Sequence, residues 1–235
     1  HTLHELSGII IDCSHNTSIV SCVKQGIIQT CQDIKVGGLA LNQCLQQLLA
    51  ANEIILTTTA ELELLKDMKE KHCYLADDFD AAIAEEIIYE LPDGNVIPLK
   101  SERFKCTEPL FKPHLLGLES PGIAESIEMQ LNEIAMKSAN SSPNEKKQEK
   151  QALVSNIVLS GKTCKIPNFE NRLLKEVREH CLNAKNRDLT INVFDTSVQD
   201  EYAIVRGLCA VAQQKIFLQV QSVSEQMFKE MGAKA

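Results

Sequence analysis

Glycine, lysine and threonine stand side by side at residues 161–163, directly after an apolar segment, in the order that ends many phosphate-binding loops. In such a loop the glycines let backbone amides surround phosphate, while the lysine and threonine meet the phosphate and its metal ion. The complete pattern also needs a glycine five residues before the second one, and Asn156 stands there instead. The sequence therefore does not predict a phosphate loop of this class.

Other residue types that can do chemistry form no convincing group. Asp12 follows an apolar segment and can hold a metal ion or water, although an aspartate at a strand end is more commonly a cap or turn residue. The acidic residues within 77–86 lack the glycine and terminal glutamate of a calcium loop, which favours a solvated helix face. Cys13, Cys22 and Cys31 recur every nine residues. Zinc sites draw paired ligands from tight turns, so we expect small apolar residues on neighbouring strands instead.

Composition excludes several classes of function. The chain has 235 residues, of which 44% are hydrophobic and 24% charged, enough for one large domain or two small ones. No apolar run approaches the roughly 18 residues needed to cross a membrane. The net charge of −8 provides no general attraction for nucleic acid or anionic lipid. Nine cysteines without a CxxC pair favour a reducing compartment. We expect a globular protein with neither a nucleic-acid partner nor membrane insertion.

The spacing of apolar residues predicts strands and helices in mixed order, as in α/β or α+β proteins. Strands are expected at 8–12, 18–23 and 26–30, forming a meander, and at 156–160 and 190–194. A hairpin is expected at 89–99, because Pro92-Asp93-Gly94 is a typical turn sequence. Helices are expected at 39–49, 59–74, 123–134, 169–180 and from 202 to 232. Residues 135–150, rich in Ser, Asn, Lys, Glu and Gln, are interpreted as a mobile surface loop.

Several ordered segments together resemble actin and the actin-related proteins. Residues 57–61 read TTTAE and residues 66–74 read KDMKEKHCY, similar to the family's TTTAE and DIKEKLCY. Further similar segments are YELPDG at 89–94, ERFKCTEPLFKP at 102–113, LGLESPGI at 116–123 and VLSG at 158–161. The resemblance runs over nearly the whole chain and corresponds to the second, C-terminal lobe of the family. It implies an α/β fold, a ribonuclease-H-like lobe in which a mixed sheet with helices carries an inserted smaller helical subdomain.

The resemblance also implies an arrangement of subdomains. Residues 1–37 and 119–202 would form the sheet-bearing subdomain, residues 38–118 the inserted helical subdomain, and residues 203–235 a C-terminal helical tail. In the family the tail packs against a first lobe that has no counterpart in this sequence. An apolar face on the tail would then be left for a protein partner. The residues expected on that face are Ala210, Val211, Gln214, Ile216, Phe217 and Val220.

The family's second phosphate loop, DSGDGVTH, is strongly altered here. The aligned residues 12–19 read DCSHNTSI, so Asp12 is kept while the two glycines become Ser14 and Asn16. Glycines allow the backbone to approach phosphate closely, and serine and asparagine do not. The histidine that helps place the attacking water becomes Ile19, which cannot polarise water. The resemblance therefore implies a degenerate loop that does not support hydrolysis.

Around the base and ribose the match is partial. Lys69 and Glu70 match the family's adenosine-contacting pair, although an ordinary solvated pair on an amphipathic helix is the simpler interpretation. The family's GGTTMYP segment reads GKTCKIP here, keeping Gly161 and Thr163. The lysine that stacks near the adenine aligns with Glu201, a reversal of charge beside a polyanion. The candidate cofactor-binding residues are therefore vestigial: Asp12, Lys69, Glu70, Gly161 and Thr163.

These features lead to one expected function and two alternatives. We expect a non-enzymatic, structural actin-related protein with no catalytic residue, no metal site and no bound ATP. It would be a cytoplasmic subunit of a larger cytoskeletal assembly, with protein subunits as partners, and would not form filaments alone because filament contacts use both lobes. One alternative is an ATP-binding actin-like protein whose first lobe lies upstream or on another chain. The other is a non-polymerising subunit of a nuclear chromatin complex, and the sequence does not separate cytoplasm from nucleus.

Overall fold

The computed structural model describes residues 7–138, 142–181 and 192–195, together with Cys209. Contacts divide the chain into two compact units, residues 1–195 and 196–235, and the description below concerns the first. The expected helix from 202 to 232, the expected tail and the six residues of its expected partner face lie outside the described residues, apart from Cys209. No helix in the described part of the chain is long and apolar enough to span a membrane.

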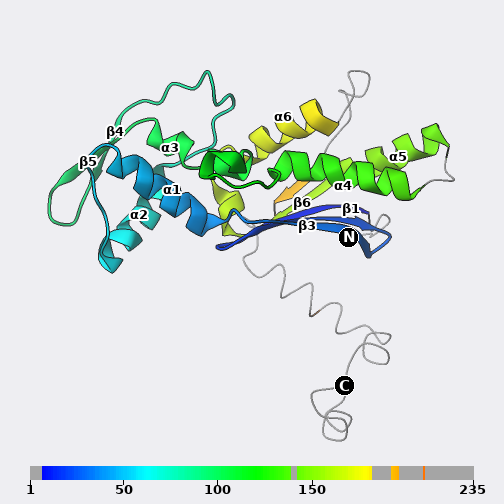
Figure 1. Cartoon of the computed structure of the whole chain (residues 1–235), viewed down its shortest axis with the longest axis horizontal. Coiled ribbons are helices and arrows are strands. Elements are labelled where there is room, and N and C mark those ends of the chain that lie inside the picture. Colours follow the sequence, from blue (N-terminus) through cyan, green and yellow to red (C-terminus); the bar gives the residue numbers. More distant parts are fainter. Residues whose placement is uncertain (1–6, 139–141, 182–191, 196–208, 210–235) are drawn as a thin grey trace, which may run out of the picture. The chain divides into compact units, whose positions relative to one another are not determined.

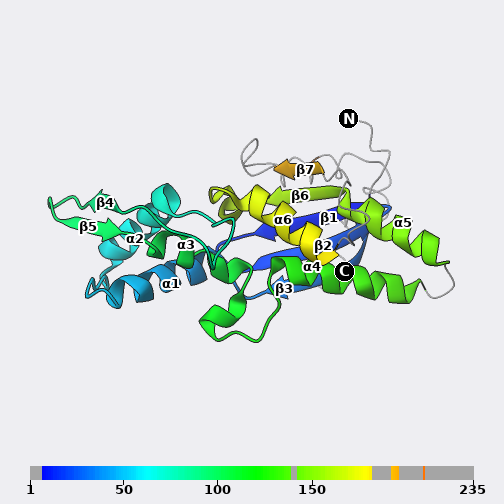
Figure 2. The same ribbon diagram turned by 90° about the horizontal axis from the view of Figure 1, so that it is seen from above.

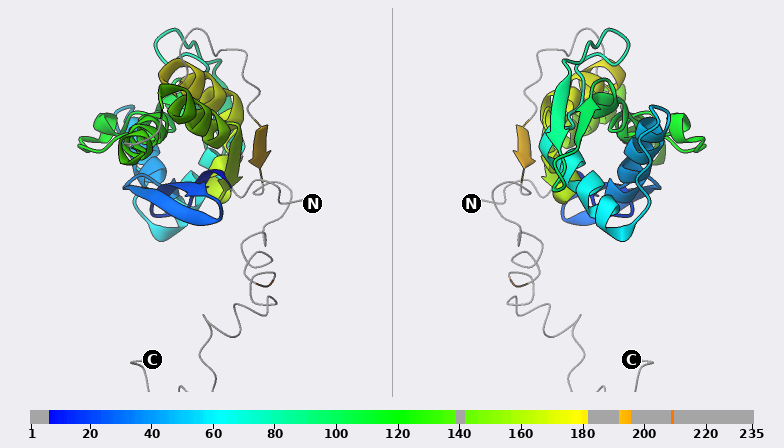
Figure 3. Two further views of the ribbon diagram at one scale, coloured as in Figure 1. Left: turned by 90° about the vertical axis from the view of Figure 1, so that its right-hand side faces the viewer. Right: turned by 90° about the vertical axis from the view of Figure 1, so that its left-hand side faces the viewer.

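A five-stranded mixed sheet with the order β3-β2-β1-β6-β7 forms the centre of this unit (Figures 1 and 2). The first three strands form the expected antiparallel meander, and β6 and β7 continue the sheet in parallel with β1. Figure 3 shows β7 at the edge of the sheet. The strands are β1 (Gly8–Cys13), β2 (Ser18–Lys24), β3 (Ile27–Ile34), β6 (Asn156–Ser160) and β7 (Asn192–Asp195).

Alternating apolar residues explain how β1 sits in the sheet. Ile9 and Ile11 are fully buried, whereas Ile10 between them is 40% exposed on the other face. The meander turns from β2 to β3 through Gln25 and Gly26, both with positive φ, as expected of a two-residue hairpin turn that matches the twist of the strands. The strands predicted at 8–12, 18–23, 26–30 and 156–160 are therefore confirmed.

Three helices lie on one face of the sheet: α4 (Ile123–Lys137), α5 (Pro143–Val154) and α6 (Phe169–Cys181) (Figures 1 and 2). Their buried side chains join those of the strands in one hydrophobic cluster. Helical spacing at 123–134 and 169–180 predicted α4 and α6, because apolar side chains three and four residues apart share one helix face. From α6 this cluster receives Phe169, Leu173, Val177 and Cys181.

The interpretation of residues 135–150 as a mobile loop is wrong. Helix α4 continues to Lys137, and α5 begins at Pro143 after residues 139–141, which lie outside the described residues. The Ser142 hydroxyl accepts a hydrogen bond from the Glu145 amide at 3.3 Å, and the Glu145 carboxylate accepts one from the Ser142 amide at 2.7 Å. This capping box, with proline in the first helical turn, initiates a helix in a segment whose Glu, Lys and Gln residues are good helix formers.

A second hydrophobic cluster, whose buried members come from the segment between Leu45 and Cys106, lies at one end of the sheet (Figure 2). A capping box between Thr58 and Glu61 begins the second helix of this segment, which was predicted at 59–74. Other residues of the segment 38–118, such as Leu41 and Leu110, belong to the first cluster. The subdomain boundaries therefore stay a prediction. The elements are α1 (Gly38–Ala50), α2 (Thr59–His72), the hairpin β4 (Ile87–Glu90) and β5 (Val96–Leu99), and α3 (Glu102–Lys105).

Arg172 on α6 forms a buried ion pair with Glu108 and a hydrogen bond with Ala76, both in segments outside the regular helices and strands of the sheet. Arg172 on α6, 3% exposed, donates from Nη2 to Oε1 of Glu108 at 2.9 Å and from Nη1 to the Ala76 carbonyl at 2.6 Å. Glu108 lies in η1 (Glu108–Leu110) and is fully buried. Burial raises the pKa of the Glu108 carboxyl, because desolvation disfavours its charged form, while the nearby Arg172 charge opposes this shift. The guanidinium therefore fixes α6 against two segments far away in the sequence.

Candidate functional site

The end of β1 and the loop of residues 14–17 form the centre of the candidate site. Asp12 is directly paired with Ile19 on β2 and with Ser160 on β6. Paired residues of neighbouring strands present their side chains on the same face, so Ile19 lies beside the Asp12 carboxylate. The Ser14 hydroxyl lies 3.4 Å from both carboxylate oxygens of Asp12. The one retained acidic residue of the loop therefore has a serine hydroxyl and an apolar side chain as neighbours.

The carbonyl groups of this loop point toward the start of α1. The Ser14 carbonyl accepts two hydrogen bonds, one from the Gly38 amide at 3.1 Å and one from the Thr163 hydroxyl at 3.0 Å. The His15 carbonyl accepts the Leu39 amide at 2.7 Å. The first amides of a helix have no partner within the helix, and here the N-cap, Gly37, has no side chain that could supply one. The loop therefore caps α1. The Gly38 and Leu39 amides, which could otherwise bind an anion, already donate hydrogen bonds to the loop carbonyls.

Gly161 has a packing reason to be glycine. Its φ is +89° and ψ is 149°, a region that residues with a side chain rarely adopt. A methyl group at this position would lie 2.6 Å from the Cys13 carbonyl carbon, closer still to its oxygen, and 2.8 Å from Oδ1 of Asp12. The turn after β6 therefore passes directly against the end of β1. This contact requires glycine with or without phosphate.

Lys69 on α2 is buried, with 8% of its surface exposed. Its ammonium donates to the Gly38 carbonyl at 3.0 Å, which joins α2 to the first turn of α1. Burial lowers the pKa of Lys69, because desolvation disfavours the ammonium, and the charge of neighbouring Glu70 opposes this shift. Glu70 itself is exposed. The interpretation of Lys69 and Glu70 as a solvated surface pair is therefore wrong for Lys69, whose side chain turns inward.

Four of the five candidate residues, Asp12, Lys69, Gly161 and Thr163, are brought together around Ser14 and the start of α1. Sequence reasoning missed the acceptor role of the loop carbonyls and the part played by the two glycines before α1. A methyl group on the first of them, Gly37, would lie 2.7 Å from the His15 carbonyl oxygen. The signal that could have found this contact is the pair of consecutive glycines directly before a helical apolar pattern. Glu201 lies outside the described residues.

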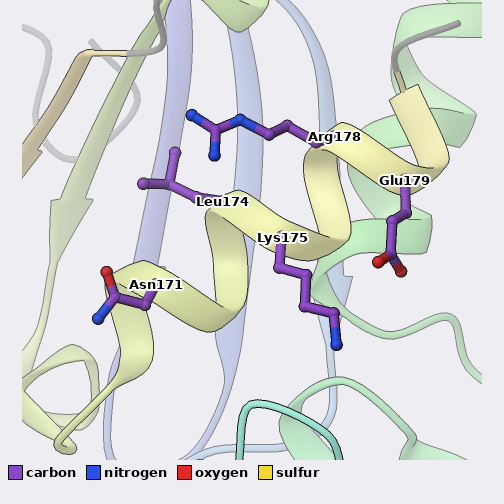
Figure 4. Close-up of a pocket in the computed structure, with 5 residues that line it drawn as sticks. All are labelled: Asn171, Leu174, Lys175, Arg178 and Glu179. Atoms are coloured by element: carbon purple, nitrogen blue, oxygen red, sulfur yellow. The ribbon is translucent and has the colours of Figure 1, made fainter. Parts of the chain in front are cut away.

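Two hollows lie away from this site. A cavity of about 470 Å³ follows the outer side of α6, where Leu174 and Arg178 extend to one side and Lys175 and Glu179 to the other (Figure 4). A smaller cavity of about 270 Å³ lies beside α5 and is lined in part by Lys24 and Glu149. Neither is lined by a candidate site residue. Within the described residues, no group of three or more His, Cys, Asp or Glu side chains could hold a metal ion.

Comparison with known proteins agrees with the sequence pattern. The family model for actin matches residues 4–235. Putative actin-29 of Dictyostelium discoideum is 27% identical over 241 aligned positions, which cover 97% of this chain and 58% of that protein. The chain thus spans little more than half the length of this relative. Together with the mixed five-stranded sheet and its helices, the match over nearly every residue shows that the chain belongs to the actin family.

Proposed function

We propose that this protein is a non-enzymatic, structural actin-related protein that acts as a cytoplasmic subunit of a larger cytoskeletal assembly. Its nucleotide site is vestigial and holds no ATP. The observation that carries this proposal is the internal use of the loop carbonyls and of the first amides of α1. Membership of the actin family supports a role within a cytoskeletal assembly.

The loop after β1 does not fit a phosphate group. Phosphate loops use glycines so that amides can approach the anion, and residues 14 and 16 carry side chains here. The Thr163 hydroxyl, which matches a position near the nucleotide, is donated to the Ser14 carbonyl. The Lys69 ammonium is likewise donated to the Gly38 carbonyl. Donating to a triphosphate would require the Thr163 hydroxyl to give up its partner, and the Lys69 ammonium already uses one of its three donors within the fold.

A second requirement for ATP hydrolysis, a polar group that orients the attacking water, is also missing from the loop. Water that attacks a phosphate needs a polar group to orient it and to take its proton. Ile19, beside Asp12 in the sheet, can neither donate nor accept a hydrogen bond. Asp12 alone leaves the attacking water without the histidine that the family resemblance implies. The loop has lost both the glycines that bind phosphate and the histidine that orients the attacking water, which supports the absence of ATPase activity.

The expected partner is another protein subunit of the assembly. We place it on the apolar face expected within residues 210–220, because such a face needs cover from another protein surface. Filament formation by the chain alone is not expected. Sedimentation of the purified chain at high concentration should leave it in the supernatant, and a pellet that grows with concentration would contradict this part of the proposal.

ATP binding is the alternative that the same residues could favour, because the structure brings Asp12, Lys69 and Thr163 to one place. Isothermal titration of the full chain with ATP and Mg²⁺ should give no binding in the micromolar range, and phosphate release should not exceed that of buffer. An ATP-binding actin, measured in the same experiment, is the positive control. Micromolar binding that is lost in Asp12→Ala would refute the proposal.

A variant that restores the two loop glycines distinguishes two explanations for the absence of ATP binding: the changed loop residues, or a site closed by the surrounding fold. We expect that Ser14→Gly combined with Asn16→Gly still binds no ATP. The reason is that the main-chain carbonyl of residue 14 would still accept from Gly38 and Thr163. Micromolar ATP binding by this double variant would show that the two side chains alone block the site. Circular dichroism of the variant controls for folding.

A further inference from the structure

Two buried thiols meet in the second hydrophobic cluster. Cys73 is the C-cap of α2, and Cys106 is the C-cap of α3. They are 1% and 0% exposed. The Cys106 thiol donates to the Cys73 sulfur at a distance of 3.4 Å between the sulfur atoms. Both are free thiols, so this is a van der Waals and hydrogen-bond contact between two groups that can be joined covalently.

Hydrogen bonds on both sides of the thiols hold the two helix ends together. The Tyr74 amide donates to the Arg103 carbonyl at 3.2 Å, and Nε of Arg103 donates to the His72 carbonyl at 2.9 Å. The Thr107 hydroxyl donates to the Tyr74 carbonyl at 2.8 Å. The residues before and after each cysteine are thus tied to the opposite segment. A covalent bond between the sulfurs would need little movement of the backbone.

The surroundings distinguish the two sulfurs. The hydrogen bond with Cys73, together with burial, raises the pKa of Cys106 well above the ordinary thiol range. Cys106 therefore keeps its proton and presents it to Cys73, whose sulfur is the acceptor. The Lys69 ammonium acts electrostatically on both thiols. Cys73, whose sulfur accepts the hydrogen bond, is therefore the first thiol to attack an oxidant, and Cys106 is the second.

We propose that Cys73 and Cys106 form a reversible intramolecular disulfide when the protein meets hydrogen peroxide. The Cys73 sulfur loses its proton and attacks one peroxide oxygen, so that an S–O bond forms, the O–O bond breaks and the leaving hydroxide takes up that proton as water. Cys106 then attacks the sulfur of the resulting sulfenic acid, so that the S–S bond forms and the S–O bond breaks. The two thiols lose two hydrogens in total, and one peroxide becomes two waters. A dithiol reductant reverses the reaction.

The bond would close a ring from residue 73 to residue 106 that contains the hairpin of β4 and β5. Closing a ring of this length restricts the unfolded chain and so stabilises the folded one. Because both sulfurs are buried, peroxide reaches them only when the segment opens locally, and the reaction is slower than at an exposed thiol. The oxidised form would hold the ends of α2 and α3 together under conditions that would otherwise separate them.

Peptide mapping of the full chain tests the proposal. The folded protein is treated with hydrogen peroxide at low protein concentration, unfolded, treated with N-ethylmaleimide to block free thiols, and digested without reductant. We expect a peptide pair linked through Cys73 and Cys106 and an intact mass lower by two hydrogens. The thermal midpoint should rise by about 5–10 °C, and dithiothreitol should reverse both changes.

Two variants sharpen the result. Cys106→Ala should give no linked pair and no rise in thermal midpoint. Cys44→Ala is the matched control, because Cys44 also acts on the pKa of Cys106 but is not its hydrogen-bond partner, and it should keep both effects. If peroxide oxidises the exposed Cys31 and Cys209 while Cys73 and Cys106 both remain open to N-ethylmaleimide, the proposal is wrong. The map of the unmodified sequence decides this even if Cys106→Ala does not fold.

Discussion

Replacing Gly161 with alanine tests why the candidate site keeps a glycine. The backbone conformation at residue 161 is accessible almost only to glycine, and a side chain there costs about 1–3 kcal/mol. The new methyl group would also lie 2.6 Å from the Cys13 carbonyl carbon. Because that neighbour is backbone, β1 itself must shift, which adds an overpacking cost of about 1–3 kcal/mol. Together these give a loss of about 2–6 kcal/mol, against a typical total stability of about 5–15 kcal/mol.

Gly94 provides the matched control. Its φ of +86° is nearly the same, but a methyl group there would have no neighbour within 4 Å. Gly94→Ala should therefore cost only the conformational term, about 1–2 kcal/mol. Both variants can be compared with the unmodified protein by urea unfolding followed by far-ultraviolet circular dichroism, since the chain has no tryptophan to report by fluorescence.

The comparison of these two variants decides between a structural and a ligand-binding reason for Gly161. If packing against β1 is the reason, Gly161→Ala loses more stability than Gly94→Ala, and adding ATP changes neither unfolding midpoint. The reasoning would be refuted if the two variants lost the same stability. It would also be refuted if ATP raised the midpoint of the unmodified protein but not that of Gly161→Ala.

Three further predictions concern groups that hold the same unit together. Arg172→Met removes the closest partner of the buried Glu108 charge and leaves only the Lys112 ammonium at 3.4 Å, so it should cost at most about 3–5 kcal/mol, most of which Glu108→Leu in the same chain restores. Thr163→Val removes one buried hydrogen bond at nearly constant volume and should cost about 1 kcal/mol. Hydrogen bonds from the amide of Thr58 and the residue before it lower the pKa of Glu61 below the ordinary 4.5. The stability from ionised Glu61 is therefore present above pH 4.5 and is lost as the pH falls through the folded-state pKa.

Each of the three has a measurement that can contradict it. Urea unfolding of the single and double variants tests the ion pair, and a double variant as unstable as Arg172→Met would refute the argument from a buried charge without its arginine partner. An unchanged midpoint in Thr163→Val would show that this hydroxyl does not stabilise the loop. For Glu61 the comparison is Glu61→Gln, which keeps an acceptor without the charge. Its stability should lie below that of the unmodified protein near neutral pH and converge with it in acid.

Much of the fold follows from local sequence patterns. Alternating apolar residues place β1 and β2 in a half-exposed sheet, and apolar residues three and four apart place α4 and α6 against it. The helix that begins at Thr59 and the Pro-Asp-Gly turn were predicted because their patterns depend on neighbouring residues alone. Helix α5 was missed because its polar composition resembles a loop, while its start depends on the specific pair Ser142 and Glu145.

The sequence by itself determined the family, most of the strands and helices, and which phosphate-loop residues have changed, because each depends on local or aligned residues. Only the tertiary structure decided how those residues are used. Whether Lys69 faces solvent or the Gly38 carbonyl depends on how α2 packs on α1. Whether Gly161 serves a ligand or the close approach of two strands depends on where β1 ends. The contact of Cys73 with Cys106 arises because two helix ends, distant in sequence, share one core.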